Sequence, residues 1–144
     1  MNRWREASEL LPPFFFEVNM TQATKVVRIL FGLIFVVFGI NYFFEFLPPQ
    51  PAPQGIAGEY ISALLKTGYF FPVLKVCEIS CGIALATGFF VPLALIVIAP
   101  IVVQIFLFHI FLAPPISLGV TLLLMGLFLG WAYRKSYAEI LKMK

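Results

Sequence analysis

The chain has 144 residues, of which 61% are hydrophobic and 12% are charged. Soluble domains contain about 45–50% apolar and about 25% charged residues, so this composition excludes a substantial soluble domain and indicates one compact integral membrane unit. The net charge of +3 gives no reason to expect nucleic-acid binding, because the basic residues flank hydrophobic segments in the manner of positive-inside topology.

The first 19 residues mix charged side chains with Trp4, and Pro12-Pro13 should break any helix before three consecutive phenylalanines. We expect residues 1–19 to be an N-terminal interfacial segment, a short helix on the membrane surface anchored by its aromatic residues. A disordered tail is the alternative. The segment lacks the order of charged, apolar and small-residue regions that is typical of a cleavable signal peptide.

A first transmembrane span is predicted at about 25–47, long enough to cross a bilayer. Gly32 and Gly39 lie at helical spacing and predict the close approach of another helix. Asn41 and Glu45, four residues apart, place a polar stripe near the end of this span. A proline-rich linker then ends the helix.

The segment at 56–67 is amphipathic, with Ile56, Tyr60 and Leu64 on one face and charged residues elsewhere. It is too short to cross a membrane. We expect a surface or re-entrant helix that lies over the mouth of the bundle.

A second span, at about 69–91, contains Lys75 and Glu78 three residues apart. An ionised side chain near the centre of a helix in lipid costs roughly 2.5–3.5 kcal/mol on insertion scales, and such residues normally mark functional sites. Two interpretations of Glu78 stay open. It is either a hydrogen-bond acceptor or proton carrier for a ligand, or a structural partner of Lys75 or of a basic residue on a neighbouring helix.

Both cysteines of the chain, Cys77 and Cys81, lie in the same span one helical turn apart, where a disulfide would strain the helix. Packing as small side chains is the preferred interpretation, and redox activity is the alternative. A metal site formed with Glu78 and His109 would lack the usual Cys-x2-Cys spacing, so we expect no metal.

A third span, at about 92–112, is interrupted by Pro100 and carries Gln104 and His109. The histidine could relay protons or hold a metal or haem, although one histidine per chain cannot provide two axial ligands. A hydrogen bond to a backbone carbonyl or to Glu45 is the preferred interpretation.

A nearly all-apolar fourth span is predicted at about 116–133, followed by a basic tail at 135–144. Four spans place both termini on one side, and eight of the ten basic residues lie there, which predicts cytoplasmic termini. We expect Arg28, one of the eight, to extend toward the lipid head groups. The eight are Arg3, Arg5, Lys25, Arg28, Arg134, Lys135, Lys142 and Lys144.

These elements predict an all-α polytopic membrane protein, a four-transmembrane-helix bundle over residues 20–134 with a short amphipathic segment between its first two helices. Apart from Arg28, the strongly polar side chains of the spans fall in the outer half of the bundle. We therefore predict a ligand site there, whose candidates are Glu78, Lys75, Asn41, Gln104, His109 and Glu45.

Four stretches are more specific as a set, by their order and spacing, than any one of them alone. They are RILFGLIFVVFGIN at 28–41, TGYF at 67–70, VCEISCGIALATGFFVP at 76–92 and HIFL at 109–112. Over about 25–133 the chain thereby resembles the DoxX and DoxX-like family of small four-helix membrane proteins. The spacing of Glu78, Gly82, Gly88 and Pro92 is the most specific part of the resemblance.

The resemblance implies attachment to membrane oxidoreductase systems, since the family takes its name from a subunit of a thiosulfate:quinone oxidoreductase. We expect an accessory subunit of a quinone-linked assembly in a bacterial inner (plasma) membrane. Its partners would be the lipid bilayer and other membrane subunits, including an oxidoreductase, and quinone is the cofactor to test for. Glu78 would accept a hydrogen bond or proton from this ligand, while Lys75, Asn41 and Gln104 would position it.

Two alternatives remain. One is a purely structural or assembly subunit of a larger membrane complex. The other is a small-molecule or ion transporter, which the absence of a visible inverted repeat disfavours. An independent enzyme is not expected, because the sequence has no nucleotide-binding loop and no arrangement of nucleophile and base.

Overall fold

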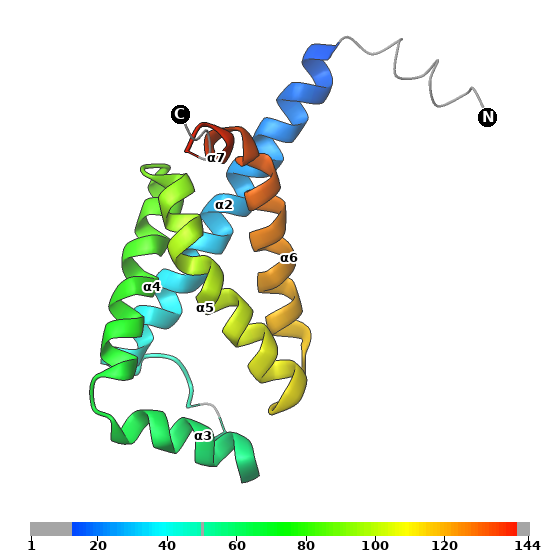
Figure 1. Ribbon diagram of the computed structural model, residues 1–144. Helices are drawn as coiled ribbons and strands as arrows, with labels where there is room; N and C mark the ends of the chain where they lie inside the picture. The colour runs from blue at the N-terminus through cyan, green and yellow to red at the C-terminus, as the bar shows by residue number, and fades with distance from the viewer. Residues whose placement is uncertain (1–12, 50, 141–144) are drawn as a thin grey trace, which may run out of the picture.

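The structure, a computed structural model, describes residues 13–49 and 51–140, and the side-chain surroundings of residues within 21–137. The fold is all-α, as predicted (Figure 1). Four helices form the bundle, one helix crosses under one end, and a short helix lies at the other. In chain order they are α2 (Pro13–Phe44), α3 (Gly55–Lys66), α4 (Phe70–Thr87), α5 (Val91–Phe111), α6 (Ser117–Ala132) and α7 (Arg134–Ile140).

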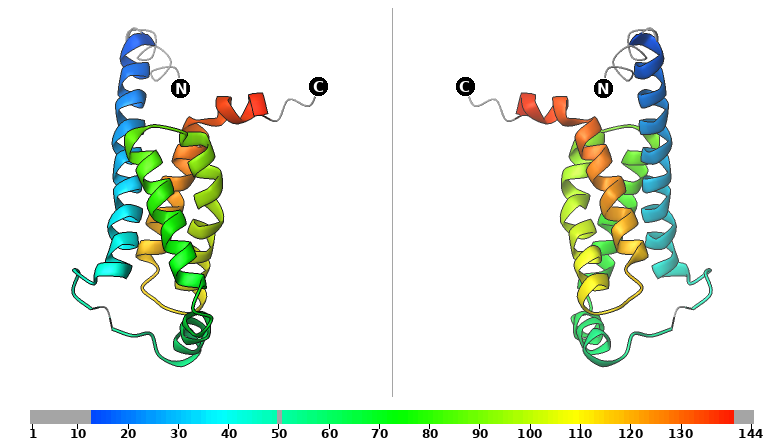
Figure 2. Two further views of the ribbon diagram at one scale, coloured as in Figure 1. Left: turned by 90° about the vertical axis from the view of Figure 1, so that its left-hand side faces the viewer. Right: turned by 90° about the vertical axis from the view of Figure 1, so that its right-hand side faces the viewer.

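The two ends of the bundle serve as landmarks below. At the α3 end, α2 and α5 finish and α4 and α6 begin, and α3 lies across them (Figure 2). At the α7 end, α4 turns into α5 and α6 turns into α7. The first turns of α2 project beyond the bundle at this end (Figures 1 and 2).

The N-terminal part of α2 corrects the expected separate segment at 1–19. Residues 13–19 are the first turns of the same continuous helix, and residues 1–12 lie outside the described part of the chain. Pro13 opens the helix instead of breaking it, because the first helical residue needs no N–H donor and proline already has a helical φ. The apolar, membrane-crossing part of α2 is 21–44, which ends three residues before the predicted end of the span.

The other helices are close to their predicted bounds. The helices α2, α4 and α5 are long and apolar enough to cross a membrane, and α6 is apolar but shorter. With 16 residues, α6 is about 24 Å long at 1.5 Å per residue, less than the roughly 30 Å of a typical hydrocarbon core. A thinner local bilayer accommodates such a helix. The predicted basic tail begins as a helix, α7, and residues 141–144 lie outside the described residues.

The helices α2 and α4 touch backbone to backbone where two glycines face each other. A Cβ atom added at Gly32 would lie 2.6 Å from the carbonyl oxygen of Gly82, and one added at Gly82 would lie 2.7 Å from the carbonyl oxygen of Gly32. A Cβ at Gly39 would lie 2.5 Å from the side chain of Ile79. The predicted close approach at Gly32 and Gly39 is thus confirmed. It is the packing device that membrane helices use when burial alone cannot drive association.

Replacing Gly32 with alanine is expected to lower the free energy of unfolding by about 1–3 kcal/mol, because rigid backbone must move to admit the methyl group. Thermal unfolding in a mild detergent measures the effect. Gly130→Ala is the matched control, since no heavy atom lies within 4 Å of a Cβ at Gly130. This control should be neutral or stabilising by up to about 1 kcal/mol. Equal losses in the two variants would contradict a specific α2–α4 contact.

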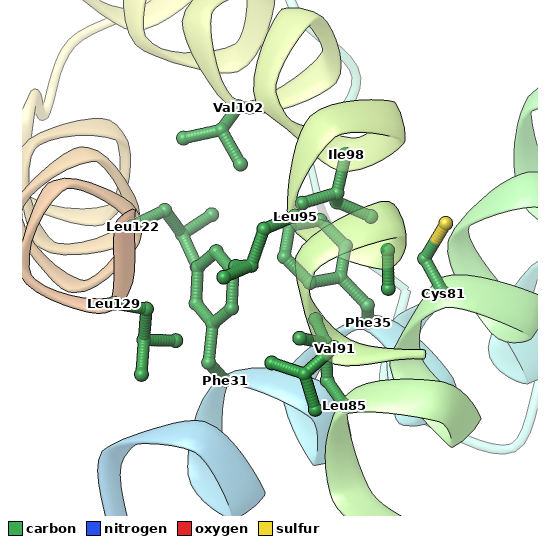
Figure 3. Packing of buried hydrophobic residues seen from close by; sticks show 11 residues of the cluster. Phe31, Phe35, Cys81, Leu85, Val91, Leu95, Ile98, Val102, Leu122 and Leu129 are labelled. Carbon is green, nitrogen blue, oxygen red and sulfur yellow. The ribbon is translucent and has the colours of Figure 1, made fainter. Parts of the chain in front are cut away.

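The core runs through the middle of the bundle, and each of its four helices contributes one fully buried large side chain (Figure 3). These are Phe31, Leu85, Ile98 and Leu129. Cys81 is 7% exposed and packs in the same cluster, as expected of a small apolar side chain. Outward-facing leucine, isoleucine and valine residues cover the remaining helix faces, which suits contact with lipid.

Candidate functional site

A cavity of about 340 Å³ lies at the α3 end, between α3, α4 and α5. Its walls are mostly apolar and aromatic, with a few polar groups, as is usual in small-molecule sites. We call it the α3 cavity. Its lining comprises Tyr60, Ile61, Leu64, Phe70, Phe71, Leu74, Lys75, Glu78, Pro100, Ile101, Gln104, Ile105, Phe108 and His109.

An ion pair on α4 forms part of the wall. Lys75 Nζ lies 2.7 Å from Glu78 Oε2, and the exposed fractions of the two side chains are 19% and 3%. Their spacing of three residues brings both side chains to one helix face. Because the carboxylate is almost completely removed from solvent, removing its partner would leave a buried charge unpaired. The pairing interpretation of Glu78 is therefore confirmed, and the same carboxylate lines the cavity.

A second cavity, of about 190 Å³, lies on the other side of this ion pair, among α2, α4, α5 and α6. We call it the interior cavity. Four residues line both cavities: Lys75, Glu78, Ile105 and His109. The ion pair and the histidine thus stand between the two spaces, where they can meet a ligand from either side.

A hydrogen bond between α5 and α3 holds α3 against the cavity. Gln104 Nε2 on α5 donates a hydrogen bond of 2.9 Å to the hydroxyl of Tyr60 on α3. The Tyr60 ring also lies 6.0 Å from that of Phe108, centroid to centroid. Tyr60 is a cavity residue that the sequence analysis did not propose as a ligand candidate. Its position on the apolar face of the 56–67 segment, which was expected to lie over the bundle, could have indicated that it lines the cavity.

His109 bonds to the backbone, which is one of the two partners preferred from the sequence. Its Nδ1 lies 2.8 Å from the carbonyl oxygen of Ile105. Because a carbonyl can only accept, Nδ1 carries the proton, and in the neutral ring Nε2 is then the acceptor. His109 is half-buried and lines both cavities, so its ring can present that acceptor to a ligand.

Two predicted candidates lie elsewhere. The side-chain oxygen of Asn41 accepts a 2.7 Å hydrogen bond from the backbone N–H of Leu47, which connects the segment after α2 to the last turn of that helix. Glu45 is exposed and has left the helix, with a φ of 47°. The prediction assumed that the helix continued to residue 47, which would have kept both on one stripe. The helix ends at Phe44, before Glu45, and neither Asn41 nor Glu45 lines the α3 cavity or the interior cavity.

Among the described residues, no three histidine, cysteine, aspartate or glutamate side chains are grouped to hold a metal ion. The site therefore offers hydrogen bonding, one close pair of opposite charges and aromatic contact. These properties suit a flat organic molecule with polar oxygen atoms.

Comparison with known proteins connects these elements to one family. No curated protein and no solved structure matches the chain. The DoxX family profile matches residues 23–110, a stretch that contains most of α2, all of α3 and α4, and all but the last residue of α5. Every residue that lines the α3 cavity lies inside this stretch. The chain is therefore a member of the DoxX family, and it is an integral membrane protein.

Proposed function

We propose that this DoxX protein is an accessory subunit of a quinone-linked redox assembly and that the α3 cavity holds the quinone head group. The observation that carries the proposal is an apolar, aromatic cavity with a buried ion pair in its wall. Its volume falls within the range of about 300–1,000 Å³ that is typical of small-molecule sites.

The lining suits the chemistry of a quinone. The ring is flat and apolar, and Phe70, Phe71 and Phe108 provide aromatic surfaces for it. The ammonium of Lys75 can donate a hydrogen bond to a quinone carbonyl, and the carboxylate of Glu78 can accept one from a quinol hydroxyl. The same pair can therefore bind both redox forms.

Reduction of a quinone to a quinol takes up two electrons and two protons. Under this proposal the electrons come from a partner oxidoreductase subunit. The chain supplies the binding site, and Glu78 takes part in moving protons to or from the ligand oxygen. Gln104 and Tyr60 hold α3 over the site, which limits the access of water.

Among the described residues, Lys25, Arg28, Arg134 and Lys135 lie at the α7 end, against Lys66 and Lys75 toward the α3 end, and this excess supports a further part of the proposal. Both termini would lie in the cytoplasm, with the protein in a bacterial inner membrane. The α3 cavity would then open toward the outer face. A reporter enzyme that is active only outside the cytoplasm, fused after residue 144, should stay inactive. A fusion in the linker before α3 should be active.

The test is purification of the tagged chain from its native membrane in a mild detergent, with mass spectrometry of co-purifying proteins and extraction of quinone from the same sample. A stoichiometric oxidoreductase together with quinone supports the proposal. Oxidoreductase activity should then fall strongly in Glu78→Gln while the complex stays assembled. The matched control, Glu59→Gln, alters an exposed carboxylate on α3 and should have no effect.

The other outcomes assign a different role. Partners without quinone, and normal partner activity in Glu78→Gln, would make the chain a structural subunit. A lone chain without quinone would remove the redox proposal. Proton-coupled uptake into liposomes that is lost in Glu78→Gln would favour transport.

A further inference from the structure

Arg28 lies at the α7 end, near the level expected for lipid head groups, and its guanidinium packs against the bundle there. Nη1 donates a 3.3 Å hydrogen bond to the hydroxyl of Tyr133. The same nitrogen lies against Gly88 in the α4–α5 turn, where an added Cβ would be only 2.7 Å away. Arg28 Nε is buried and has no hydrogen-bond partner in the structure. Among the described residues, the guanidinium therefore has one hydrogen-bond acceptor, Tyr133, and at least one buried donor without a partner.

No described carboxylate balances this charge. The acidic residues whose side chains the structure describes are Glu45, Glu59 and Glu78, and all three lie toward the α3 end. Between described residues, the one ion pair is that of Lys75 with Glu78. A half-buried cation is costly in a membrane, so an anion other than the described side chains would stabilise it.

Two tyrosines at this end of the bundle, Tyr133 and Tyr137, add further polar groups. We call Arg28 and these two tyrosines the polar corner. Tyr137 on α7 packs against the core next to Tyr133. Burial raises the pKa of the Tyr137 phenol, and the neighbouring Tyr133 raises it further. Tyr137 therefore keeps its proton at neutral pH and can donate a hydrogen bond. The corner presents donors from three helices: α2, α7 and the end of α6.

An apolar groove of about 430 Å³ begins at this corner and follows α5 and α6. Tyr137 lines the groove together with Phe31, which lies one helical turn after Arg28. Figure 1 shows α5 and α6 side by side, with α7 at one end of the pair. Gly126 and Gly130 lie along the groove, and a Cβ at Gly130 would have no atom within 4 Å. This space can accept a slender apolar chain.

We propose that the corner formed by Arg28, Tyr133 and Tyr137 binds the phosphate of a phospholipid whose acyl chain occupies the α5–α6 groove. The planar guanidinium matches phosphate geometry and binds it with charge-assisted hydrogen bonds. The groove is continuous with the corner through Tyr137. A phospholipid joins an anionic phosphate to a long apolar chain, which are the two features that this surface needs. A helix from a second copy could fill the groove, but the acidic side chains described here lie at the wrong end to reach Arg28.

Trp131 allows the proposal to be tested, because it lines the groove and is one of two tryptophans in the chain. Trp4→Phe leaves it as the sole tryptophan. In maltoside micelles, which contain no phosphate, its fluorescence is titrated with phosphatidylglycerol carrying brominated acyl chains. A parallel titration uses diacylglycerol with the same chains. We expect the phosphate-bearing lipid to quench at a mole fraction roughly ten-fold lower, the scale of a charge-assisted hydrogen bond.

Three variants separate the contributions of Arg28, of a neighbouring exposed charge and of the groove to the lipid preference. In Arg28→Gln the two lipids should quench almost equally, whereas Lys25→Gln, which removes the same charge from an exposed residue one turn earlier, should keep the difference. Gly130→Leu adds a side chain to the groove at a position where a Cβ meets no heavy atom within 4 Å, keeps Arg28 and should also reduce the advantage of phosphatidylglycerol. Circular dichroism and size-exclusion chromatography confirm that each variant is folded.

Further outcomes identify the ligand. Inorganic phosphate at millimolar concentration should not relieve the quenching by phosphatidylglycerol; relief would show that the corner binds free phosphate and would overturn the lipid assignment. Equal quenching by both lipids in the parent protein would also overturn it. A Gly130→Leu variant that changes oligomeric state but keeps the lipid preference would assign the groove to a second copy of the chain.

Discussion

Lys75→Met is expected to destabilise the folded protein by about 3–5 kcal/mol, the usual cost of leaving one member of a buried ion pair without its partner. Glu78 is 3% exposed and lies 2.7 Å from Lys75 Nζ, so little solvent can replace the lost ammonium. Unfolding in mixed micelles with increasing dodecyl sulfate measures the difference.

The second variant of this series separates the charge effect from packing. Adding Glu78→Gln to Lys75→Met removes the orphaned charge and should recover most of the loss, because a neutral pair of similar volume can be nearly as stable as the ion pair. Lys66→Met is the matched control at an exposed lysine on α3, where surface charges contribute about 0–1 kcal/mol. If Lys75→Met were no worse than Lys66→Met, the carboxylate would have another partner.

Leu74→Trp is expected to reduce the quinone bound per protein at least ten-fold, because the larger side chain projects into the α3 cavity that Leu74 lines. A ring that must share about 340 Å³ with an added indole loses its contacts. Quinone extracted from the purified protein, or a fluorescent quinone analogue titrated into it, gives the measurement.

Val76→Trp is the matched control for this prediction, two residues along the same helix but 55% exposed and facing outward. It places the same indole against lipid and should leave quinone binding unchanged. Loss of binding in both variants would indicate a general effect on α4. Normal binding in Leu74→Trp would place the ligand outside the α3 cavity and remove the basis for assigning roles to Lys75 and Glu78.

How well the sequence placed each polar candidate depended on whether its position is set within one helix or by where a helix ends. The pairing of Lys75 with Glu78 was one of the interpretations open from the sequence, and it is the one that depends least on the rest of the fold, because residues three apart on a helix lie on one face. Gln104 and His109 reached the α3 cavity because their depth in α5 follows from the length of a predicted helix. Asn41 and Glu45 do not line this cavity: Asn41 bonds the backbone of Leu47, and Glu45 lies beyond the end of α2, which comes three residues earlier than predicted.

Arg28 and Tyr60 make contacts that the sequence did not predict. Both have ordinary sequence interpretations, a basic residue near head groups and an aromatic residue on an amphipathic face. Their partners are distant along the chain: Tyr133 lies 105 positions from Arg28, and Gln104 lies 44 from Tyr60. Helical periodicity gives the direction of a side chain on its own helix but does not identify the atoms that meet it.

The sequence alone determined the membrane class, the all-α bundle, the close approach of another helix at Gly32 and Gly39, and the DoxX family, because composition, span length and residue spacing are local properties. Only the tertiary structure decided that Glu78 stands between two cavities, that Tyr60 closes one of them, and that Arg28 packs against the bundle beside an open groove. Cavities and counter-ions depend on how separate helices pack, and that packing depends on side-chain shapes that periodicity does not record.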